Sequence, residues 1–160
     1  MEHSISKKAF KNLNYMLINI TITFITFLFM EFVAWFTHKY IMHGFLWYLH
    51  KDHHQPKKNH IFQKNDSFFL IFATPGISTI TLGIYYSNWL LYIGIGISLY
   101  GLTYFVIHDI LVHQRIKLFK KLSSPYLKGL RKAHKVHHKN TNKENGESFG
   151  MLFFPLKYWE

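Results

Sequence analysis

The chain has 160 residues, a length typical of one compact domain, and its 19 basic and 8 acidic side chains give a formal net charge of +11. Such a charge can indicate a nucleic-acid-binding protein, but 49% of the residues are hydrophobic and the 41 residues from Ser67 to Ile107 include no charged residue and no histidine. Because a domain of 19.2 kDa has no interior large enough for such a run, the composition favours a lipid bilayer as solvent and argues against nucleic acid as a partner.

The first predicted element is an apolar helix over residues 13–36, in which Glu31 is the single charged residue. A membrane-spanning helix needs about 20 apolar residues, because the hydrocarbon core is roughly 30 Å thick and each residue rises about 1.5 Å. No small-residue cleavage site accompanies this segment, so we expect an uncleaved span rather than a removable signal peptide.

The uncharged run predicts two further spans, at 67–86 and 89–107, joined by a short turn at Ser87–Asn88 into an antiparallel hairpin. Small residues in the third span either let neighbouring helices approach closely or are ordinary membrane-helix composition. These residues are Gly94, Gly96, Ser98 and Gly101.

Three crossings would place residues 37–66 and the chain from His108 onward on one side of the membrane. Sixteen of the 19 basic residues then lie on that side, which the positive-inside rule assigns to the cytoplasm. Basic residues before a first span usually keep the N-terminus inside, so a fourth crossing stays open. The predicted fold is therefore an all-α integral membrane protein, one domain over residues 1–160, with three or four transmembrane helices and a cytoplasmic histidine-rich helical cap.

Ten of the twelve histidines form two blocks, at 38–54 and 108–138, each with an H-x4-H pair followed by an H-x-x-H-H triplet. On a helix, residues i, i+3 and i+4 share a face, so we expect each triplet to direct three imidazoles to one place. A pair five residues apart is separated by about 140° around an α-helix, but its long side chains can still converge on a metal ion beside a helix end. Each block must also turn, at Gly44 in the first and at Ser123–Pro125 in the second, where 108–121 would fold against 126–138. The ten histidines are His38, His43, His50, His53, His54, His108, His113, His134, His137 and His138.

The histidine pattern predicts a pair of metal ions. The chain has no cysteine, which excludes iron–sulfur clusters and thiolate ligands, and ten imidazoles exceed what one tetrahedral zinc needs. If each ion takes four or five imidazoles and prefers six-coordination, a position remains open for dioxygen or water, which favours iron. Zinc could replace iron in purified protein, since it lies above iron in the affinity series for nitrogen ligands.

Three acidic residues are candidates for roles at this centre. Asp52 and Asp109 lie inside the blocks and could orient a ligand imidazole, with a solvated or helix-capping acid as the alternative for each. Glu31 precedes His38 by two helical turns, roughly 10 Å deeper in the membrane, where ionisable residues are usually functional. We expect it to hydrogen-bond a ligand histidine or to line the substrate pocket, against the alternative of a purely structural contact.

The residues around the histidines resemble those of the bacterial β-carotene 3-hydroxylases, a group within the fatty acid hydroxylase superfamily of membrane non-haem di-iron enzymes. The resemblance extends from Met30 to about Phe153. It is carried by Met30–Glu31, His38–Gly44, Asn65–Asp66, Tyr104–Arg115, Tyr126–Lys128, Ala133–His138 and Glu147–Gly150. The bare histidine pattern would also fit desaturases, sterol oxidases and ketolases.

By this resemblance, the ten histidines bind two iron ions in a multi-pass protein of the bacterial inner membrane. One oxygen atom of O2 is inserted at C3 of each β-ionone ring, which converts β-carotene to β-cryptoxanthin and then to zeaxanthin. The alternatives are hydroxylation or desaturation of another membrane lipid and a non-catalytic membrane metal-binding protein.

Electrons must come from another protein, because the chain has no flavin or nicotinamide motif and no cysteine for a cluster. The basic residues on the predicted cytoplasmic side would suit an acidic ferredoxin, unless they serve only to set topology and contact anionic lipid. The most prominent are Arg115, Lys117, Lys120, Lys121, Lys128, Arg131 and Lys132.

Overall fold

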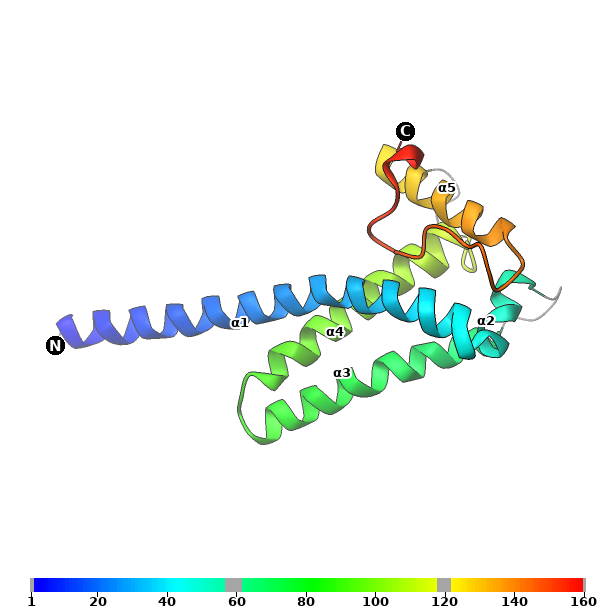
Figure 1. The fold of residues 1–160 in the computed structure, drawn as a ribbon. Coiled ribbons are helices and arrows are strands. Elements are labelled where there is room, and N and C mark those ends of the chain that lie inside the picture. The colour runs from blue at the N-terminus through cyan, green and yellow to red at the C-terminus, as the bar shows by residue number, and fades with distance from the viewer. Residues whose placement is uncertain (1, 57–61, 118–121, 160) are drawn as a thin grey trace.

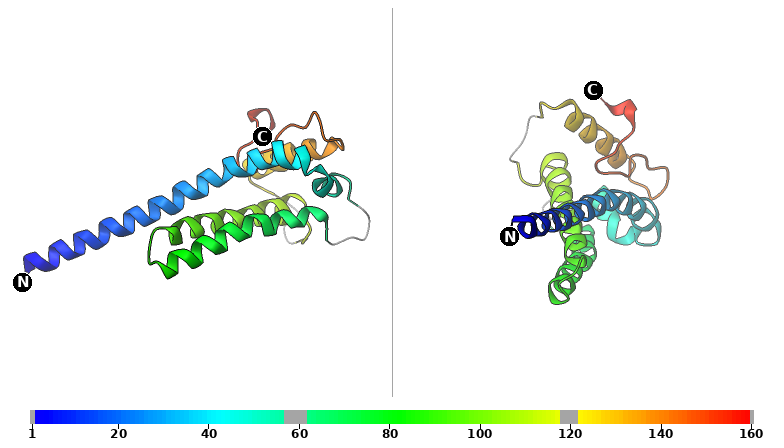
Figure 2. Two further views of the ribbon diagram at one scale, coloured as in Figure 1. Left: turned by 60° about the horizontal axis from the view of Figure 1, so that its bottom comes forward. Right: turned by 90° about the vertical axis from the view of Figure 1, so that its left-hand side faces the viewer.

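The computed structural model is entirely helical and loop-connected over the parts of the chain that it describes, residues 2–56, 62–117 and 122–159 (Figure 1). Three long helices form its body: α1 (Glu2–Phe36), α3 (Ser67–Tyr85) and α4 (Leu90–Tyr104). The contacts place α4 between the other two. Two shorter helices, α2 (Trp47–His54) and α5 (Pro125–Lys139), lie at the end of the body away from the N-terminus and from the turn between α3 and α4 (Figures 1 and 2).

The three expected apolar helices are present. Three helical segments, Lys7–Phe45, Lys64–Tyr85 and Leu90–Val112, are long and apolar enough to cross a membrane. The helix α3 agrees with the predicted second span within one residue. The helix α1 begins earlier than the predicted residue 13, because residues 2–12 contain no proline or glycine to interrupt it.

Small residues do let α4 approach its neighbours. A Cβ atom added at Gly94 would lie 2.7 Å from the backbone nitrogen of Ile80 on α3, and one added at Gly96 would lie 2.7 Å from the carbonyl oxygen of Thr23 on α1. The same expectation is wrong for Gly101, where an added Cβ meets no atom within 4 Å. Two close backbone contacts therefore fix α4 against both partners.

The burial pattern is the reverse of that in a water-soluble domain. Large apolar side chains of the long helices point outward, with Phe24 60% exposed and Ile77 and Ile84 each 63% exposed. The largest fully buried side chains among the described residues are two histidines, His50 and His137. The long helices thus have an apolar exterior, and polar side chains are buried at one end of the molecule.

Both predicted turns exist, and the second begins earlier in the chain than expected. Gly44 has non-helical angles (φ −102°, ψ −126°) and turns the chain from the end of the first long helix into α2, as expected. In the second block the helix ends at Val112, and Gln114 adopts a left-handed conformation (φ 54°). The non-helical stretch therefore begins about ten residues earlier than expected, but the predicted break at Ser123–Pro125 is present: Ser124 is extended and α5 begins at Pro125. Of the expected segment 108–121, residues 118–121 lie outside the described residues.

Candidate metal centre

Each H-x4-H pair lies on a π-helical turn, which the sequence analysis did not predict. The segments are η1 (Thr37–Phe45) and η3 (Phe105–Val112). The backbone N–H of His113 donates to the carbonyl of His108 at 2.8 Å, a bond that spans five residues. This winding places residues i and i+5 on one face, so the ring centroids are 5.3 Å apart for His38 and His43 and 4.4 Å apart for His108 and His113. The expected convergence of each pair is confirmed, whereas the expected separation of about 140° is wrong because it assumed α-helical geometry.

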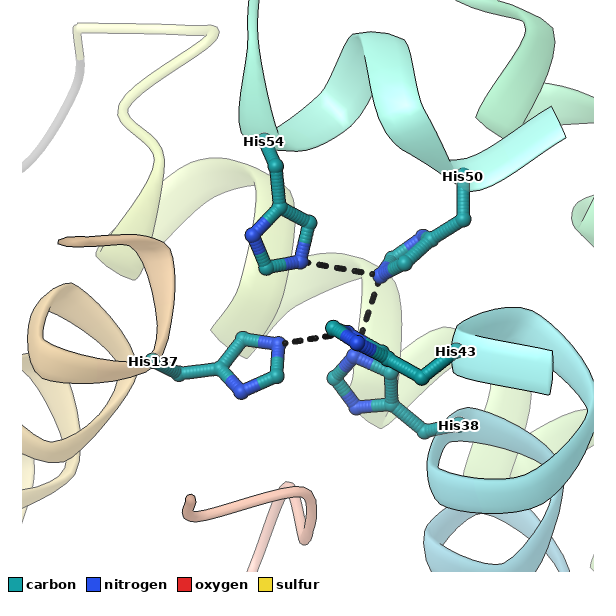
Figure 3. A group of neighbouring side chains, drawn as sticks. All are labelled: His38, His43, His50, His54 and His137. Atoms are coloured by element: carbon teal, nitrogen blue, oxygen red, sulfur yellow. Dashed lines mark hydrogen bonds between the residues drawn. The ribbon is translucent and has the colours of Figure 1, made fainter. Parts of the chain in front are cut away.

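Nine of the ten predicted histidines gather into two groups that could each hold a metal ion. Within each group the potential ligand nitrogens all lie within 4.8 Å of one another. Figure 3 shows rings from the first long helix, from α2 and from α5 pointing toward a common centre. The first group contains His38, His43, His50, His54 and His137. The second group contains His53, His108, His113 and His134.

The two groups do not follow the two sequence blocks. His53 of the first block belongs to the second group, and His137 of the second block belongs to the first group. On an α-helix, residue i+4 lies about 40° around the axis from residue i, and residue i+3 lies about 60° from residue i in the opposite direction. The last two histidines of a triplet therefore point about 100° apart. The expectation that each triplet serves one place is therefore wrong: α2 and α5 lie between the groups and each contributes to both.

His138 lies where the two groups meet. Its ring stacks on that of His54, with centroids 4.4 Å apart, and lies 4.5 Å from the ring of His134. Its Nε2 is buried and has no hydrogen-bond partner, a condition that costs about 1–3 kcal/mol unless something else binds that nitrogen.

Hydrogen bonds at the outer nitrogens fix the protonation of the first group. Each of its five Nδ1 atoms faces an oxygen that can only accept, so each Nδ1 carries the hydrogen and donates it. The acceptors are the carbonyls of Phe149 (2.9 Å from His38), Lys143 (3.0 Å from His43), Asn140 (2.8 Å from His54) and Glu147 (2.8 Å from His137), and Oδ1 of Asn65 (2.6 Å from His50). All five Nε2 atoms therefore present bare lone pairs to the centre of the group.

These lone pairs require a cation. Nε2 of His50 lies 3.1 Å from Nε2 of His38 and 3.2 Å from Nε2 of His54, with no hydrogen available between them. In the second group, the Nε2 atoms of His53 and His108 lie 3.2 Å apart. Converging lone pairs repel one another unless a positive ion lies between them, so the residues fit imidazole-bound metal ions held by outer hydrogen bonds.

Burial keeps four of these histidines neutral. Desolvation is the largest cause in each case, and it lowers the pKa of His50 to about 2, of His54 to about 4, of His113 to about 2 and of His137 to about 3. Near pH 7 the lone pairs are therefore not lost to protons, and the site is ready for a metal ion.

Asp52 and Asp109 both take part in the outer hydrogen bonds, in different ways. Asp109 Oδ2 lies 3.4 Å from Nδ1 of His108, a long contact, and its Oδ1 pairs with Arg115 Nε at 3.0 Å. Asp52 contacts no imidazole directly; it accepts from the backbone N–H groups of Lys64 and Asn65 at 2.6 and 3.4 Å, and so holds the loop that carries Asn65.

The hydrogen bond expected between Glu31 and a histidine does not form. The Glu31 carboxyl is 4% exposed, and its Oε1 accepts the backbone N–H groups of Met151, Leu152 and Phe153 at 2.8–3.0 Å. Its Oε2 accepts the Tyr100 hydroxyl at 2.7 Å. The side chain turns toward the C-terminal segment because three N–H donors converge there.

From the sequence we missed two side chains that bind histidines, a third that binds one of those two, and the backbone carbonyls of residues 140–149 described above. Asn65 binds His50, Gln63 Oε1 accepts from Nδ1 of His53 at 2.9 Å, and Arg115 donates to Gln63 at 2.8 Å. Because an arginine can only donate, its contact also fixes which end of the Gln63 amide faces His53. Asn65 and Arg115 lie in the stretches that carried the family resemblance, but their spacing from the histidines gives no sign of contact.

Comparison with known proteins gives one family model and several relatives. The model of the fatty acid hydroxylase family matches residues 23–158. A β-carotene hydroxylase from Pantoea ananas is 44% identical over 137 residues, and one from Pseudescherichia vulneris is 42% identical over 141 residues; each match covers 86% of this chain and 78% of the relative. A β-carotene hydroxylase from a Paracoccus species is 38% identical over 138 residues, covering 86% of this chain and 85% of the relative. No solved structure matches the chain significantly.

Proposed function

The chain belongs to the fatty acid hydroxylase family, and from this premise we propose that it is a β-carotene 3-hydroxylase. The reaction consumes β-carotene, O2, two electrons and two protons, and yields β-cryptoxanthin and water; a second turnover on the other ring yields zeaxanthin. The names and identities of the bacterial relatives support the substrate class.

The observation that carries the proposal is the pair of buried imidazole groups at one end of an apolar helical body. A ring C–H bond is not acidic, so general acid–base groups cannot break it and a metal must supply the oxidising power. When bound, two iron ions would supply dioxygen activation at these groups. We assign the first ion to the five histidines of the first group, and the second to the four of the second group together with His138.

We further propose that the three apolar helices span the bacterial inner membrane and that the histidine cap lies on its cytoplasmic face. The outward apolar side chains and the distribution of basic residues support this orientation. A carotenoid dissolved in the bilayer would then enter laterally between the helices, and its ring would reach the cap without crossing water. The close helix contacts and the buried cap would exclude water from the reacting carbon.

A ferredoxin-type donor is proposed to supply the electrons to the basic surface of the cap. On α5, Lys128, Lys132, Lys135 and Lys139 are exposed. Arg115 and Arg131 instead bind within the cap, the latter to the carbonyl of Leu111, and Lys120 and Lys121 lie outside the described residues. Lys128, Lys135 and Lys139 of α5, together with the exposed Lys117, are therefore the main candidates for contact with an acidic donor.

Expression in cells that accumulate β-carotene tests the function, with the pigments separated by chromatography and identified by mass. We expect products heavier by one and by two oxygen atoms, and none when oxygen is withheld. His108→Ala should abolish them, whereas His3→Ala, which changes a histidine outside the motifs, should not. Products lighter by two hydrogens would identify a desaturase, and unchanged pigment alongside bound metal would identify a carrier; either result would refute the proposal.

A further inference from the structure

The first histidine group is covered by one segment of chain, residues 140–153, which we call the C-terminal strap. Four of the five Nδ1 hydrogens of that group are donated to its backbone carbonyls, those of Asn140, Lys143, Glu147 and Phe149. Carbonyls that accept from a ligand imidazole set the direction of its ring and raise its basicity. The position of the strap therefore sets the geometry of the first group.

The strap has little structure of its own. Residues 140–153 contain no helix. Ser148, between the two carbonyls that bind His137 and His38, has a left-handed backbone (φ 61°), a conformation that L side chains rarely adopt and that persists only where the surroundings impose it. Something outside the strap must therefore hold it in place.

Glu31 provides one such anchor from inside α1; the strap is also held by Lys157 and Tyr158, which bind the Glu147 carboxylate, and by Gln55, which donates to the carbonyl of Thr141. The Glu31 carboxyl accepts the N–H groups of Met151, Leu152 and Phe153, directly after the last carbonyl that binds the group. The turn that presents them is tight: a Cβ atom added at Gly150 would lie 2.3 Å from the carbonyl oxygen of Phe153 and 3.1 Å from Glu31 Oε1. The Tyr100 hydroxyl fixes the other carboxyl oxygen, so the anchor joins α1, α4 and the strap.

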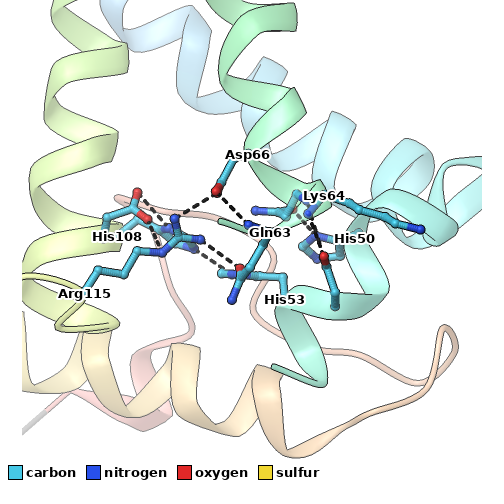
Figure 4. A network of polar contacts seen from close by, with 10 residues as sticks. His50, His53, Gln63, Lys64, Asp66, His108 and Arg115 are labelled. Carbon is cyan, nitrogen blue, oxygen red and sulfur yellow. Dashed lines mark hydrogen bonds and ion pairs between the residues drawn. The ribbon is translucent and has the colours of Figure 1, made fainter. Parts of the chain in front are cut away.

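The second group is held by a different network. Nδ1 of His53 donates to Gln63, and Nδ1 of His108 faces Asp109. One guanidinium, that of Arg115, binds both of these partners and also pairs with Asp66 at 2.8 Å (Figure 4). No hydrogen bond among the described residues joins this network to the strap or to Glu31.

We propose that Glu31 is a positioning residue for the first metal ion alone, acting through the C-terminal strap, and that Arg115 has this role for the second ion. Arg115 affects the first ion only indirectly, through Asn65, which lies between Gln63 and Asp66 and binds His50. This inference rests on the proposed two-ion centre. It predicts that the two affinities can be changed separately, although the histidines of the two groups alternate along α2 and α5.

Release of iron to an excess of chelator, followed in detergent-solubilised protein, tests the inference. The wild type should release two ions per chain. Glu31→Gln keeps the shape of the side chain but removes the charge that strengthens its three N–H contacts, and should speed the release of one ion about 10- to 100-fold. Arg115→Lys keeps the charge but loses the planar fork, and should speed the release of the other ion to a similar degree.

Chemical modification of free imidazole, mapped by mass spectrometry during release, identifies the ion. In Glu31→Gln, His43 and His54 should become reactive before His113 and His134, and in Arg115→Lys the order should reverse. Tyr100→Phe, which removes only the hydroxyl from the anchor, should resemble Glu31→Gln with a smaller effect and should fold normally by circular dichroism.

Equal acceleration of both ions by Glu31→Gln, or no acceleration in either Glu31→Gln or Tyr100→Phe, would overturn the inference while leaving the two-ion centre intact. A wild-type chain that binds no iron would instead refute the proposed function.

Discussion

Paired alanine substitutions test whether the two ions are held across the sequence blocks. His50 and His53 lie three residues apart on α2 but belong to different groups, whereas His50 and His137 lie in different blocks but share the first group. The pair His50→Ala/His137→Ala should therefore weaken one ion only, and the pair His50→Ala/His53→Ala should weaken both.

The size of the effect follows from the number of ligands. Structural zinc sites with four ligands bind with an apparent 10–16 kcal/mol, so one ligand contributes about 2.5–4 kcal/mol, or about 100- to 1000-fold in affinity. The pair within the first group removes two of five nitrogens and should weaken that ion by about 10⁴- to 10⁶-fold, while the second ion keeps its wild-type affinity. The pair on α2 removes one nitrogen from each group and should weaken both ions by about 100- to 1000-fold.

Competition with chelators of graded affinity measures both constants, with iron counted per chain and helix content checked by circular dichroism. His53→Ala/His134→Ala is the matched control, because it removes two nitrogens from the second group and should spare the first ion. If His50→Ala/His53→Ala weakened one ion and His50→Ala/His137→Ala weakened both, each ion would belong to one sequence block, and the grouping described here would be refuted.

Three further predictions follow from the cap. Metal-free protein should lose thermal stability as the pH falls below 6.5. Burial lowers the pKa of His54 to about 4 and of His50 to about 2, so below pH 6.5 the histidines of the unfolded chain bind protons while these folded ones stay neutral. A melting temperature that stays level between pH 7.5 and 5.0 would contradict this. Asn65→Leu removes the acceptor of His50 and should weaken binding of the first ion about 10- to 100-fold in chelator competition. Asn65→Asp keeps an acceptor and should retain most of the wild-type affinity. An equal loss of affinity in both variants would count against an orienting role. The rate at which a ferredoxin reduces the protein, measured by stopped-flow spectroscopy, should fall steeply with added salt and should be lower in a Lys128→Glu/Lys135→Glu variant. A rate that depends on neither change would indicate that these charges contact only lipid.

The long helices and the identity of the gathered histidines could be predicted because each depends on local sequence. Apolar length alone predicts the spans at 67–86 and 89–107, and the structure has helical segments there over Lys64–Tyr85 and Leu90–Val112. The repeated order of the two blocks indicates that their histidines act together, and nine of the ten lie in the two groups.

The distribution of the histidines between the groups could not be predicted, because it depends on backbone winding and on packing. An H-x4-H pair is compatible with an α-helix or a π-helix, and the two place the second ring on different faces. Which ion His53 or His137 faces depends on where α2 and α5 lie relative to each other, and the histidine spacing does not encode that placement.

The partners of Glu31 could not be predicted for a related reason. The position of this residue in an apolar helix indicates that it has a role, but its acceptor sites are filled by N–H groups 120 to 122 residues further along the chain. Only the folded chain brings them together, and it redirects the expected contact from a histidine to the segment that positions the histidines.

An experimental map of the iron-loaded chain, with iron located by its anomalous scattering, tests the central claim most directly. The account predicts two iron ions, one bound among His38, His43, His50, His54 and His137 and the other among His53, His108, His113 and His134. A single ion, or two ions that each bind histidines of only one sequence block, would contradict it.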